Sequence, residues 1–165
     1  MSLSIAVLTV SDTRTTETDT SGELLANLLL KDGHNLYGRS IVKDDIYQIR
    51  AVVSNWIADS NVDVVVSTGG TGFSGRDSTP EALTPLFDKV IEGFGEMFRY
   101  VSIEEIGSST IQSRAVAGLA NDTVIFALPG SNNGCRTGWE KIIRHQLDES
   151  FRPCNFAELI NRNRK

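Results

Sequence analysis

Apolar residues are distributed along the chain in two alternating patterns. The first is a short, nearly continuous apolar run, which is typical of a strand covered on both faces of a sheet. Such runs predict strands over 5–10, 62–67 and 123–128, and the less apolar segment 37–42 predicts a weaker strand. Between and after these runs, apolar residues recur at the spacing of a helix that buries one face. Strands that alternate with helices of this length predict right-handed crossovers and a mostly parallel α/β sheet.

The predicted helices have recognisable start and stop residues. Gly33 suits the position just after a first helix, and Asp44 or Asp45 suits the N-cap of a second. Thr79-Pro80 opens a third, because proline is favoured in the first turn. Helices are accordingly predicted over 20–32, 46–57, 79–91, 94–106 and 139–147.

Length and composition favour a single domain over 1–165. Hydrophobic residues make up 40% and charged residues 22%, which is ordinary for a soluble domain. In the segment 151–165, four basic residues stand against one acidic residue, and this segment is expected to be a solvated C-terminal tail.

The charge and the N-terminus exclude several classes of protein. A net charge of −5 disfavours a nucleic-acid partner. No apolar run approaches the roughly 20 residues that span a bilayer, so no membrane partner is expected. The first residues lack the basic start and the cleavage site of a signal peptide. We therefore expect a cytoplasmic protein.

Cysteine and histidine are too sparse to build a metal centre. Cys135 and Cys154 are too few and too isolated for a disulfide scaffold or a zinc site, so free thiols are expected. His34 and His145 have no partner at ligand spacing, and both are expected at the surface. No Ser/His/Asp or Cys/His arrangement can be assembled, which disfavours nucleophilic acyl chemistry. Any metal would sit on carboxylates and substrate oxygens.

Polar and glycine-rich segments follow each predicted strand. Open sheets of this kind bind ligands beyond the carboxyl ends of their strands. The segments, in chain order, are Ser11-Asp12, Lys43-Asp44-Asp45, Thr68-Gly69-Gly70-Thr71-Gly72 and Pro129-Gly130-Ser131. We expect a ligand site where they converge.

The glycine run has two interpretations. Glycine permits positive φ and a close approach of the backbone to a ligand, and successive N–H groups can form an anion cradle. A tight turn without a ligand explains the glycines equally well. The run matches neither the P-loop nor the Rossmann fingerprint.

The acidic residues near this run suggest Mg²⁺, which joins carboxylates to phosphate oxygens. Asp77 lies five residues beyond Gly72, and Asp44 lies in another strand-end loop. Capping of a helix by Asp44 and closure of a turn by Asp77 are the alternatives. Arg76 either pairs with Asp77, which we favour, or meets an anionic ligand. Ser11, Asp12 and Ser131 either bond a ligand or only cap a turn or a helix, and chemistry alone gives no interpretation of Ser113.

Together these segments resemble the MoaB/MogA family of molybdenum cofactor biosynthesis proteins. The matching motifs are Thr9-Val10-Ser11-Asp12, Asp19-Thr20-Ser21-Gly22, Thr68-Gly69-Gly70-Thr71-Gly72, Arg76-Asp77, Thr79-Pro80-Glu81-Ala82, Ser113-Arg114-Ala115-Val116-Ala117-Gly118 and Pro129-Gly130-Ser131. Residues 135–140 and 152–156 resemble the MoaB branch in particular.

The resemblance implies a three-layer, doubly wound α/β fold that binds molybdopterin, a pterin with a dithiolene and a terminal phosphate. In active members this phosphate attacks the α-phosphorus of Mg-ATP, giving adenylylated molybdopterin and pyrophosphate. Asp44 and Asp77 match the acidic pair, which implies catalytic and Mg²⁺-binding roles. Positions that match ligand contacts are Ser11, Asp12, Thr68, Gly69, Gly70, Thr71, Gly72, Ser113, Pro129, Gly130 and Ser131.

Two main hypotheses follow. Retention of Asp44 and Asp77 favours an Mg²⁺- and ATP-dependent molybdopterin adenylyltransferase. Lys43, Gly75 and Ser131 replace residues that active members often have, which favours a non-catalytic protein that binds molybdopterin or scaffolds other pathway proteins. A phosphate-binding domain outside molybdenum metabolism is a third, weaker possibility.

The resemblance also implies a homo-oligomer, either a trimer or a hexamer. Apolar residues crowd one short segment, which is either a surface for self-association or ordinary core. They are Phe94, Met97, Phe98, Tyr100 and Val101.

Overall fold

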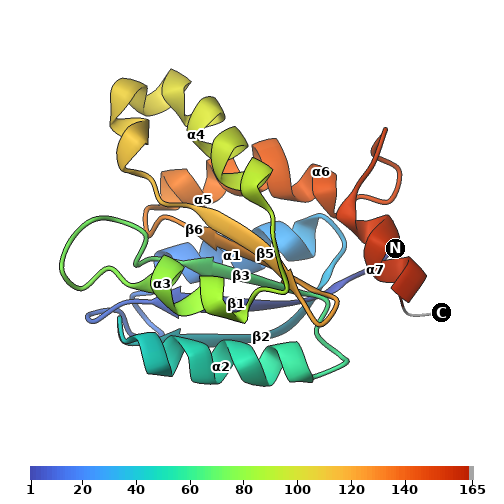
Figure 1. Ribbon diagram of the computed structural model, residues 1–165, viewed down its shortest axis with the longest axis horizontal. Coiled ribbons are helices and arrows are strands. Elements are labelled where there is room, and N and C mark those ends of the chain that lie inside the picture. The colour runs from blue at the N-terminus through green and yellow to red at the C-terminus, as the bar shows by residue number, and fades with distance from the viewer. Residues whose placement is uncertain (164–165) are drawn as a thin grey trace.

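The computed structural model describes residues 1–163 and shows a six-stranded sheet with helices on both faces (Figure 1). The strands are β1 (Ser4–Val10), β2 (Asn35–Val42), β3 (Val64–Thr68), β4 (Lys89–Val90), β5 (Val116–Ala120) and β6 (Thr123–Leu128). The α-helices are α1 (Thr20–Lys31), α2 (Ile46–Ala58), α3 (Thr79–Leu83), α4 (Glu92–Ile106), α5 (Asn132–Gly138), α6 (Arg144–Gln146) and α7 (Phe156–Asn163). Two 3₁₀ segments, η1 (Thr84–Leu86) and η2 (Gly107–Gln112), and a π-helical segment, η3 (Trp139–Ile143), complete the chain. No helix in this described part combines the length and apolar character needed to cross a membrane.

The winding of the sheet reverses between β1 and β3. The strand order is β2-β1-β3-β6-β5-β4, with β2, β1, β3 and β6 parallel to one another. From β1 the chain continues to β2, which lies on one side of β1, and then to β3, which lies on the other side of β1. Ligands of open α/β sheets bind outside the carboxyl ends of the strands at such a point. The predicted mostly parallel sheet is confirmed.

Side chains of the central strands alternate between two cores. Ile5 and Val7 pack in the core that also holds residues of α1, α4, α5 and α7, whereas Ala6 and Leu8 pack with residues of α2 and α3. Because both faces of β1 are covered, the strand is apolar at nearly every position. The three-layer, doubly wound α/β fold is therefore confirmed (Figure 1).

The third predicted helix is wrong beyond its first turn. α3 ends at Leu83, and Pro85 follows in η1. Proline lacks the N–H that would continue the helical hydrogen bonds. Val90 lies instead in β4, opposite Gly118 of the antiparallel strand β5, and neither strand was predicted from the sequence.

The expectation that both histidines lie at the surface is wrong for His34. Its side chain is buried, and its Nδ1 accepts a hydrogen bond from the N–H of Leu3 at 3.3 Å. The ring lies edge-on to Trp139, with 6.3 Å between the ring centroids. His145 is exposed, as expected.

The C-terminal segment is not a solvated tail. Residues 156–163 form α7, in which Ala157 and Ile160 are buried in the core beside Phe156. Arg162 is exposed on this packed helix, and Arg152 is exposed in the segment that precedes it. Arg164 and Lys165, which belong to the same basic segment, lie outside the described residues.

Candidate functional site

The ends of three parallel strands are level at one edge of the sheet. Strand pairing places Thr9 of β1 opposite Thr68 of β3, and Thr68 opposite Leu128 of β6. The N–H of Gly69 donates to the carbonyl of Leu128 at 3.0 Å. A Cβ added at Gly130 would lie 3.4 Å from the Cα of Gly69. The strand-end segments thus meet, and they line a cavity of about 590 Å³.

The turn after β3 requires glycine. Gly69 and Gly70 have φ angles of 99° and 67°, which residues with a side chain rarely adopt. A Cβ at Gly69 would collide with the carbonyl oxygen of Val10, and one at Gly70 with the hydroxyl of Thr79. Thr79 also donates its hydroxyl to the carbonyl of Gly69 at 2.8 Å. The turn is therefore held between β1 and the start of α3, and residues 69–72 line the cavity.

Asp44 is buried beside this turn. Its Oδ1 accepts hydrogen bonds from the N–H and the hydroxyl of Ser78, at 3.0 and 2.6 Å. Its Oδ2 would lie 2.9 Å from a Cβ added at Gly70. The N-cap of α2 is Asp45, so Asp44 does not cap that helix. Asp44 instead joins the end of β2 to the residue that precedes α3.

Asp77 lies in the loop between β3 and α3, on the same cavity as Asp44. Its Oδ2 accepts the N–H of Ser74 at 2.8 Å, and its own N–H donates to the carbonyl of Ser74 at 3.0 Å. The Oδ2 would lie 2.7 Å from a Cβ added at Gly72. The two carboxylates thus stand beside Gly70 and Gly72 of one glycine run, and they do not lie on opposite sides of the molecule.

Arg76 pairs with Asp12, so the favoured pairing with Asp77 is wrong. Its Nε and Nη2 donate to the two carboxylate oxygens of Asp12, each at 2.9 Å. The same carboxylate accepts the N–H of Asp44 at 3.1 Å. These hydrogen bonds, with that of Arg76 as the largest cause, lower the pKa of Asp12 to about 2. Asp12 is a permanent anion at neutral pH that connects three strand-end loops.

Two predicted contact residues use their hydroxyls within the protein. Ser11 Oγ accepts the N–H groups of Thr13 and Arg14 at 3.2 and 3.1 Å, which closes a turn. Thr68 is fully buried, and its hydroxyl donates to the carbonyl of Pro129 at 2.8 Å. Ser11 lines the cavity, whereas Thr68 lies beneath it and supports the turn that begins at Pro129.

Two other serines line the cavity in different ways. Ser131 is the N-cap of α5, where its Oγ accepts the N–H of Gly134 at 3.1 Å. The Oγ of Ser113 is buried and has no hydrogen-bond partner among the described residues. A buried hydroxyl left without a partner costs about 1–3 kcal/mol. Ser113 is therefore the lining residue whose geometry most directly indicates a bound ligand.

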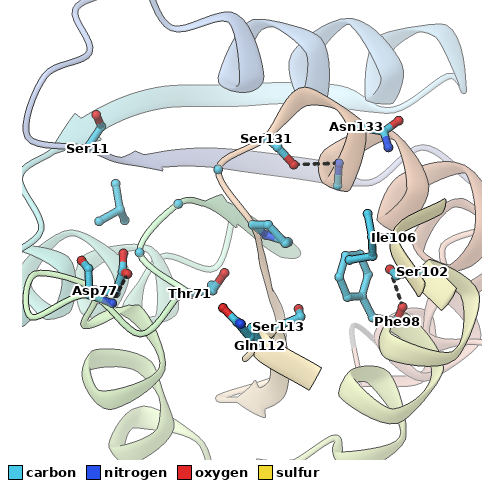
Figure 2. Close-up of a pocket in the computed structure, with 18 of the residues that line it drawn as sticks. Ser11, Thr71, Asp77, Phe98, Ser102, Ile106, Gln112, Ser113, Ser131 and Asn133 are labelled. Carbon is cyan, nitrogen blue, oxygen red and sulfur yellow. Dashed lines mark hydrogen bonds between the residues drawn. The ribbon is translucent and has the colours of Figure 1, made fainter. Parts of the chain in front are cut away.

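A second group of lining residues, not predicted from the sequence, comes from α4, η2 and α5. They are Phe98, Ser102, Glu105, Ile106, Ser109, Gln112, Asn133, Gly134 and Thr137. Figure 2 shows Phe98 and Ile106 at the opposite end of the cavity from Asp77. The signal was present, because Phe98, Ser102 and Glu105 recur at helical spacing on one face of α4. The cavity has a polar, glycine-rich end and a partly apolar end.

The carboxylates of this cavity fit Mg²⁺ as a partial ligand set. Within residues 1–163, Asp44 Oδ2 and Asp77 Oδ1 accept no hydrogen bond. Mg²⁺ takes one or two carboxylates and completes its shell with phosphate oxygens and water. In the same part of the chain, no group of three or more His, Cys, Asp and Glu residues is arranged to hold a metal ion. An anionic substrate would have to supply further ligands.

Known proteins are similar to this chain in sequence and in fold. The family model described as "Probable molybdopterin binding domain" matches residues 6–149. The chain belongs to the MoaB/MogA family. Among its relatives, molybdenum cofactor biosynthesis protein B of Escherichia coli (strain K12) is 59% identical over 152 residues, covering 92% of this chain and 89% of that protein.

Solved structures of the MoaB/MogA family confirm the resemblance. A crystal structure of molybdenum cofactor biosynthesis protein B matches with a TM-score of 0.91 at 41% identity, covering 98% of both chains. The tungsten cofactor synthesizing protein MoaB from Pyrococcus furiosus matches with a TM-score of 0.77 at 40% identity, covering 86% of this chain and 90% of that one. The motifs that suggested the MoaB branch therefore identified the family correctly.

Proposed function

We propose that this chain binds molybdopterin and transfers the adenylyl group of ATP to its terminal phosphate, within molybdenum cofactor biosynthesis. Membership of the MoaB/MogA family and the names of its relatives support the pathway and the ligand. The transfer is supported by one observation above all. Asp44 and Asp77 stand beside Gly70 and Gly72 of a single turn and line one cavity.

The proposed reaction needs orientation more than a nucleophilic side chain. An oxygen of the molybdopterin phosphate forms a bond to the α-phosphorus of ATP, the bond from that phosphorus to the bridging oxygen breaks, and pyrophosphate leaves. Transfer of this kind depends on alignment and on neutralising charge. The backbone of 69–72 and the turn 129–131 line the part of the cavity where phosphates would be oriented.

Asp44 and Asp77 are the residues that would hold Mg²⁺. When bound, Mg²⁺ neutralises charge on phosphate oxygens. The chain's part is to keep both carboxylates in place, and Ser78 and Ser74 do so by hydrogen bonds to one oxygen of each. The partly apolar end of the cavity, with Phe98 and Ile106, suits a planar ring system.

A direct assay tests the proposal. Purified protein is incubated with molybdopterin, Mg²⁺ and ATP, and adenylylated molybdopterin and pyrophosphate are quantified by chromatography and mass spectrometry. Formation of both in equal amounts supports the transfer. Binding of molybdopterin without product rejects the enzymatic half, and absence of binding rejects the whole proposal.

A non-catalytic molybdopterin-binding protein is the second candidate. Both hydrogen bonds from Ser78 go to Asp44, so a structural role alone accounts for the burial of that carboxylate. Lys43, Gly75 and Ser131 also differ from the residues that active family members often have. The assay above separates the two candidates, because only the enzyme releases pyrophosphate.

We further propose that the chain forms a homo-oligomer, a trimer or a hexamer, as the family resemblance implies. Support comes from the outer face of α4, where Met97, Tyr100 and Ile103 are all exposed. Contiguous apolar surface of this kind marks an interaction site more often than isolated exposed residues do.

A further inference from the structure

Between Phe73 and Asp77, the loop that carries Asp77 is weakly attached to the body of the protein by its own residues, whereas Ser78 at its end donates to the buried Asp44. Residues 73–76 are exposed, and the bonds between Ser74 and Asp77 stay within the loop. Arg76 reaches Asp12, but the two side chains are 64% and 37% exposed. Exposed ion pairs of this kind contribute little to stability. The position of the Asp77 carboxylate therefore depends on Ser78 on one side and on a contact from outside the loop.

Arg114, in the segment between η2 and β5, makes that contact. Its Nε donates to the carbonyl of Gly72 at 2.8 Å, and its Nη2 donates to the carbonyl of Asp77 at 3.2 Å. Its Nη1 pairs with the carboxylate of Glu81 in α3. The side chain of Arg114 is 23% exposed, less than that of Arg76. The guanidinium of Arg114 thus contacts the start of the loop at Gly72, the loop near its end at Asp77, and helix α3 at Glu81.

The backbone and the ring next to this guanidinium strengthen the attachment. The N–H of Arg114 donates to the carbonyl of Thr71 at 3.2 Å. The guanidinium carbon lies 5.1 Å from the centre of the Phe73 ring, a distance typical of a cation–π contact. The neighbouring Ser113 carries the unpartnered hydroxyl of the cavity. The same short segment therefore contacts both the ligand space and the loop.

Lysine cannot reproduce this set of contacts. A guanidinium presents five donors in a rigid planar fork, whereas an ammonium is a single point charge on a flexible stem. Lysine at position 114 would keep the charge and reach only part of the acceptors, which lie at both ends of the loop. The carbonyls of Gly72 and Asp77 would lose their fixed donor, and the loop would sample other positions.

We propose that Arg114 is a positioning residue for Asp77: by bridging both ends of the loop 72–78, it fixes the carboxylate at the place where Mg-ATP is bound. The kinetic consequence rests on the proposed function. The structural part of the proposal, that Arg114 immobilises the loop, does not depend on the proposed function.

The test compares Arg114→Lys with Arg50→Lys as a matched control. Arg50 makes the same kind of clamp, because its Nε and Nη2 donate to the carbonyls of Ala82 and Glu81 at 3.0 and 2.9 Å. These carbonyls belong to α3 and not to the loop. Hydrogen–deuterium exchange of the loop amides and the Mg²⁺ dependence of adenylyl transfer are measured for both variants.

For Arg114→Lys we expect faster exchange in 73–77, a higher Mg²⁺ concentration at half-maximal rate, and a kcat lowered about ten- to a hundredfold, since small misplacements have effects of that size. The Kd of molybdopterin stays within about twofold, because the glycine turn itself is unchanged. Arg50→Lys leaves loop exchange and the Mg²⁺ requirement at wild-type values. Glu81→Gln, which keeps both carbonyl bonds of Arg114, also leaves them unchanged.

Wild-type loop exchange in Arg114→Lys overturns the proposal. The proposal is also overturned if loop exchange and the Mg²⁺ requirement change equally in Arg114→Lys and Arg50→Lys, since equal changes would reflect a general loss of stability. If Arg114→Lys does not fold, Arg114→Gln takes its place, because its single amide nitrogen can reach at most one of the two carbonyls, and wild-type loop exchange in that variant overturns the proposal. If the wild-type chain forms no product, the proposed function fails, while the exchange comparison still decides whether Arg114 holds the loop.

Discussion

Asp44 and Asp77 are each fixed through one carboxylate oxygen and keep the other available. Ser78 occupies Oδ1 of Asp44, and Ser74 occupies Oδ2 of Asp77. In the sequence alone, capping of a helix by Asp44 and closure of a turn by Asp77 would explain the two residues without a ligand. The structure adds that both residues line the same cavity.

At this scale, we expect Asp77→Asn to lower adenylyl transfer by about 10²-fold or more, because removing one charge-stabilising group has effects of that size. The asparagine oxygen can still accept the N–H of Ser74, so the turn and the affinity for molybdopterin are retained. Product formation and equilibrium binding measure the two effects separately. Undiminished turnover in this variant would remove Asp77 from the mechanism.

Asp45→Asn is the matched control for this substitution. Asp45 neighbours Asp44 in sequence but caps α2 and does not line the cavity. Asparagine is about as good an N-cap as aspartate, so stability and transfer should both stay near wild type. A comparable loss of transfer in Asp45→Asn would mean that net charge, and not the placement of Asp77, controls the rate.

At the scale of elements, the sequence predicted the parallel strands and failed at the antiparallel edge. β1, β3 and β6 are nearly continuous apolar runs, because both of their faces are covered, whereas the edge strand β2 is partly polar and was the weaker of the predicted strands. β4 has only two residues, and β5 contains Gly118, so neither produces a recognisable pattern. The spacing of Phe87 and Val90 fits a helix, but Pro85 interrupts that helix before it reaches them.

Gly118 of β5 allows the ring of Phe87 to pack closely against the antiparallel edge of the sheet. A Cβ at this position would collide with the ring of Phe87, which packs directly over β5. We expect Gly118→Ala to destabilise the protein by about 1–3 kcal/mol, the usual cost of overpacking. Urea unfolding measures the change. Gly38→Ala in β2 is the control, because a Cβ there meets no atom within 4 Å, and a shift within about 0.5 kcal/mol is expected.

His34 links the end of α1 to the start of β1 and makes stability depend on pH. Burial, the largest cause, lowers the pKa of His34 below 6.5, and its Nδ1 accepts the N–H of Leu3 only when unprotonated. The unfolded chain therefore binds this proton first, and stability is lost as the pH falls from 6.5 toward the lower folded pKa.

The variant His34→Gln tests this link. Its amide oxygen can accept the same N–H without titrating, so the stability of the variant should change less than that of wild type across the same pH interval. Urea midpoints at a series of pH values give the two curves. Parallel curves would show that His34 does not contribute to the acid sensitivity.

At the scale of the molecule, the winding of the sheet brings the site together. Segments as distant in sequence as Ser11, Gly69 and Pro129 become neighbours because β1, β3 and β6 are adjacent and parallel. This convergence was predictable from the alternation of strands and helices. The contribution of α4 was not, because helical spacing alone shows that a face is buried and does not show which residues reach the edge of the sheet.

The apolar segment of α4 combines both roles that the sequence allowed. Phe94 and Phe98 are core residues, 4% and 2% exposed. Met97 and Tyr100, by contrast, are 49% and 72% exposed, and Val101 is partly buried against the core. The outer face of the same helix thus remains without a partner within the described chain.

We expect this outer face to form the contact between copies of the chain. Ile103 is 51% exposed and lies on it about one turn beyond Tyr100. Sedimentation velocity of the wild-type protein at micromolar concentration should give a trimer or a hexamer, and Ile103→Arg should shift it to smaller species, since a charge buried without a partner opposes association. Leu30→Arg on α1, a residue equally exposed at 51%, should leave the oligomer intact. A wild-type monomer under these conditions would reject the assembly, and an unchanged oligomer in Ile103→Arg would move the contact to another face.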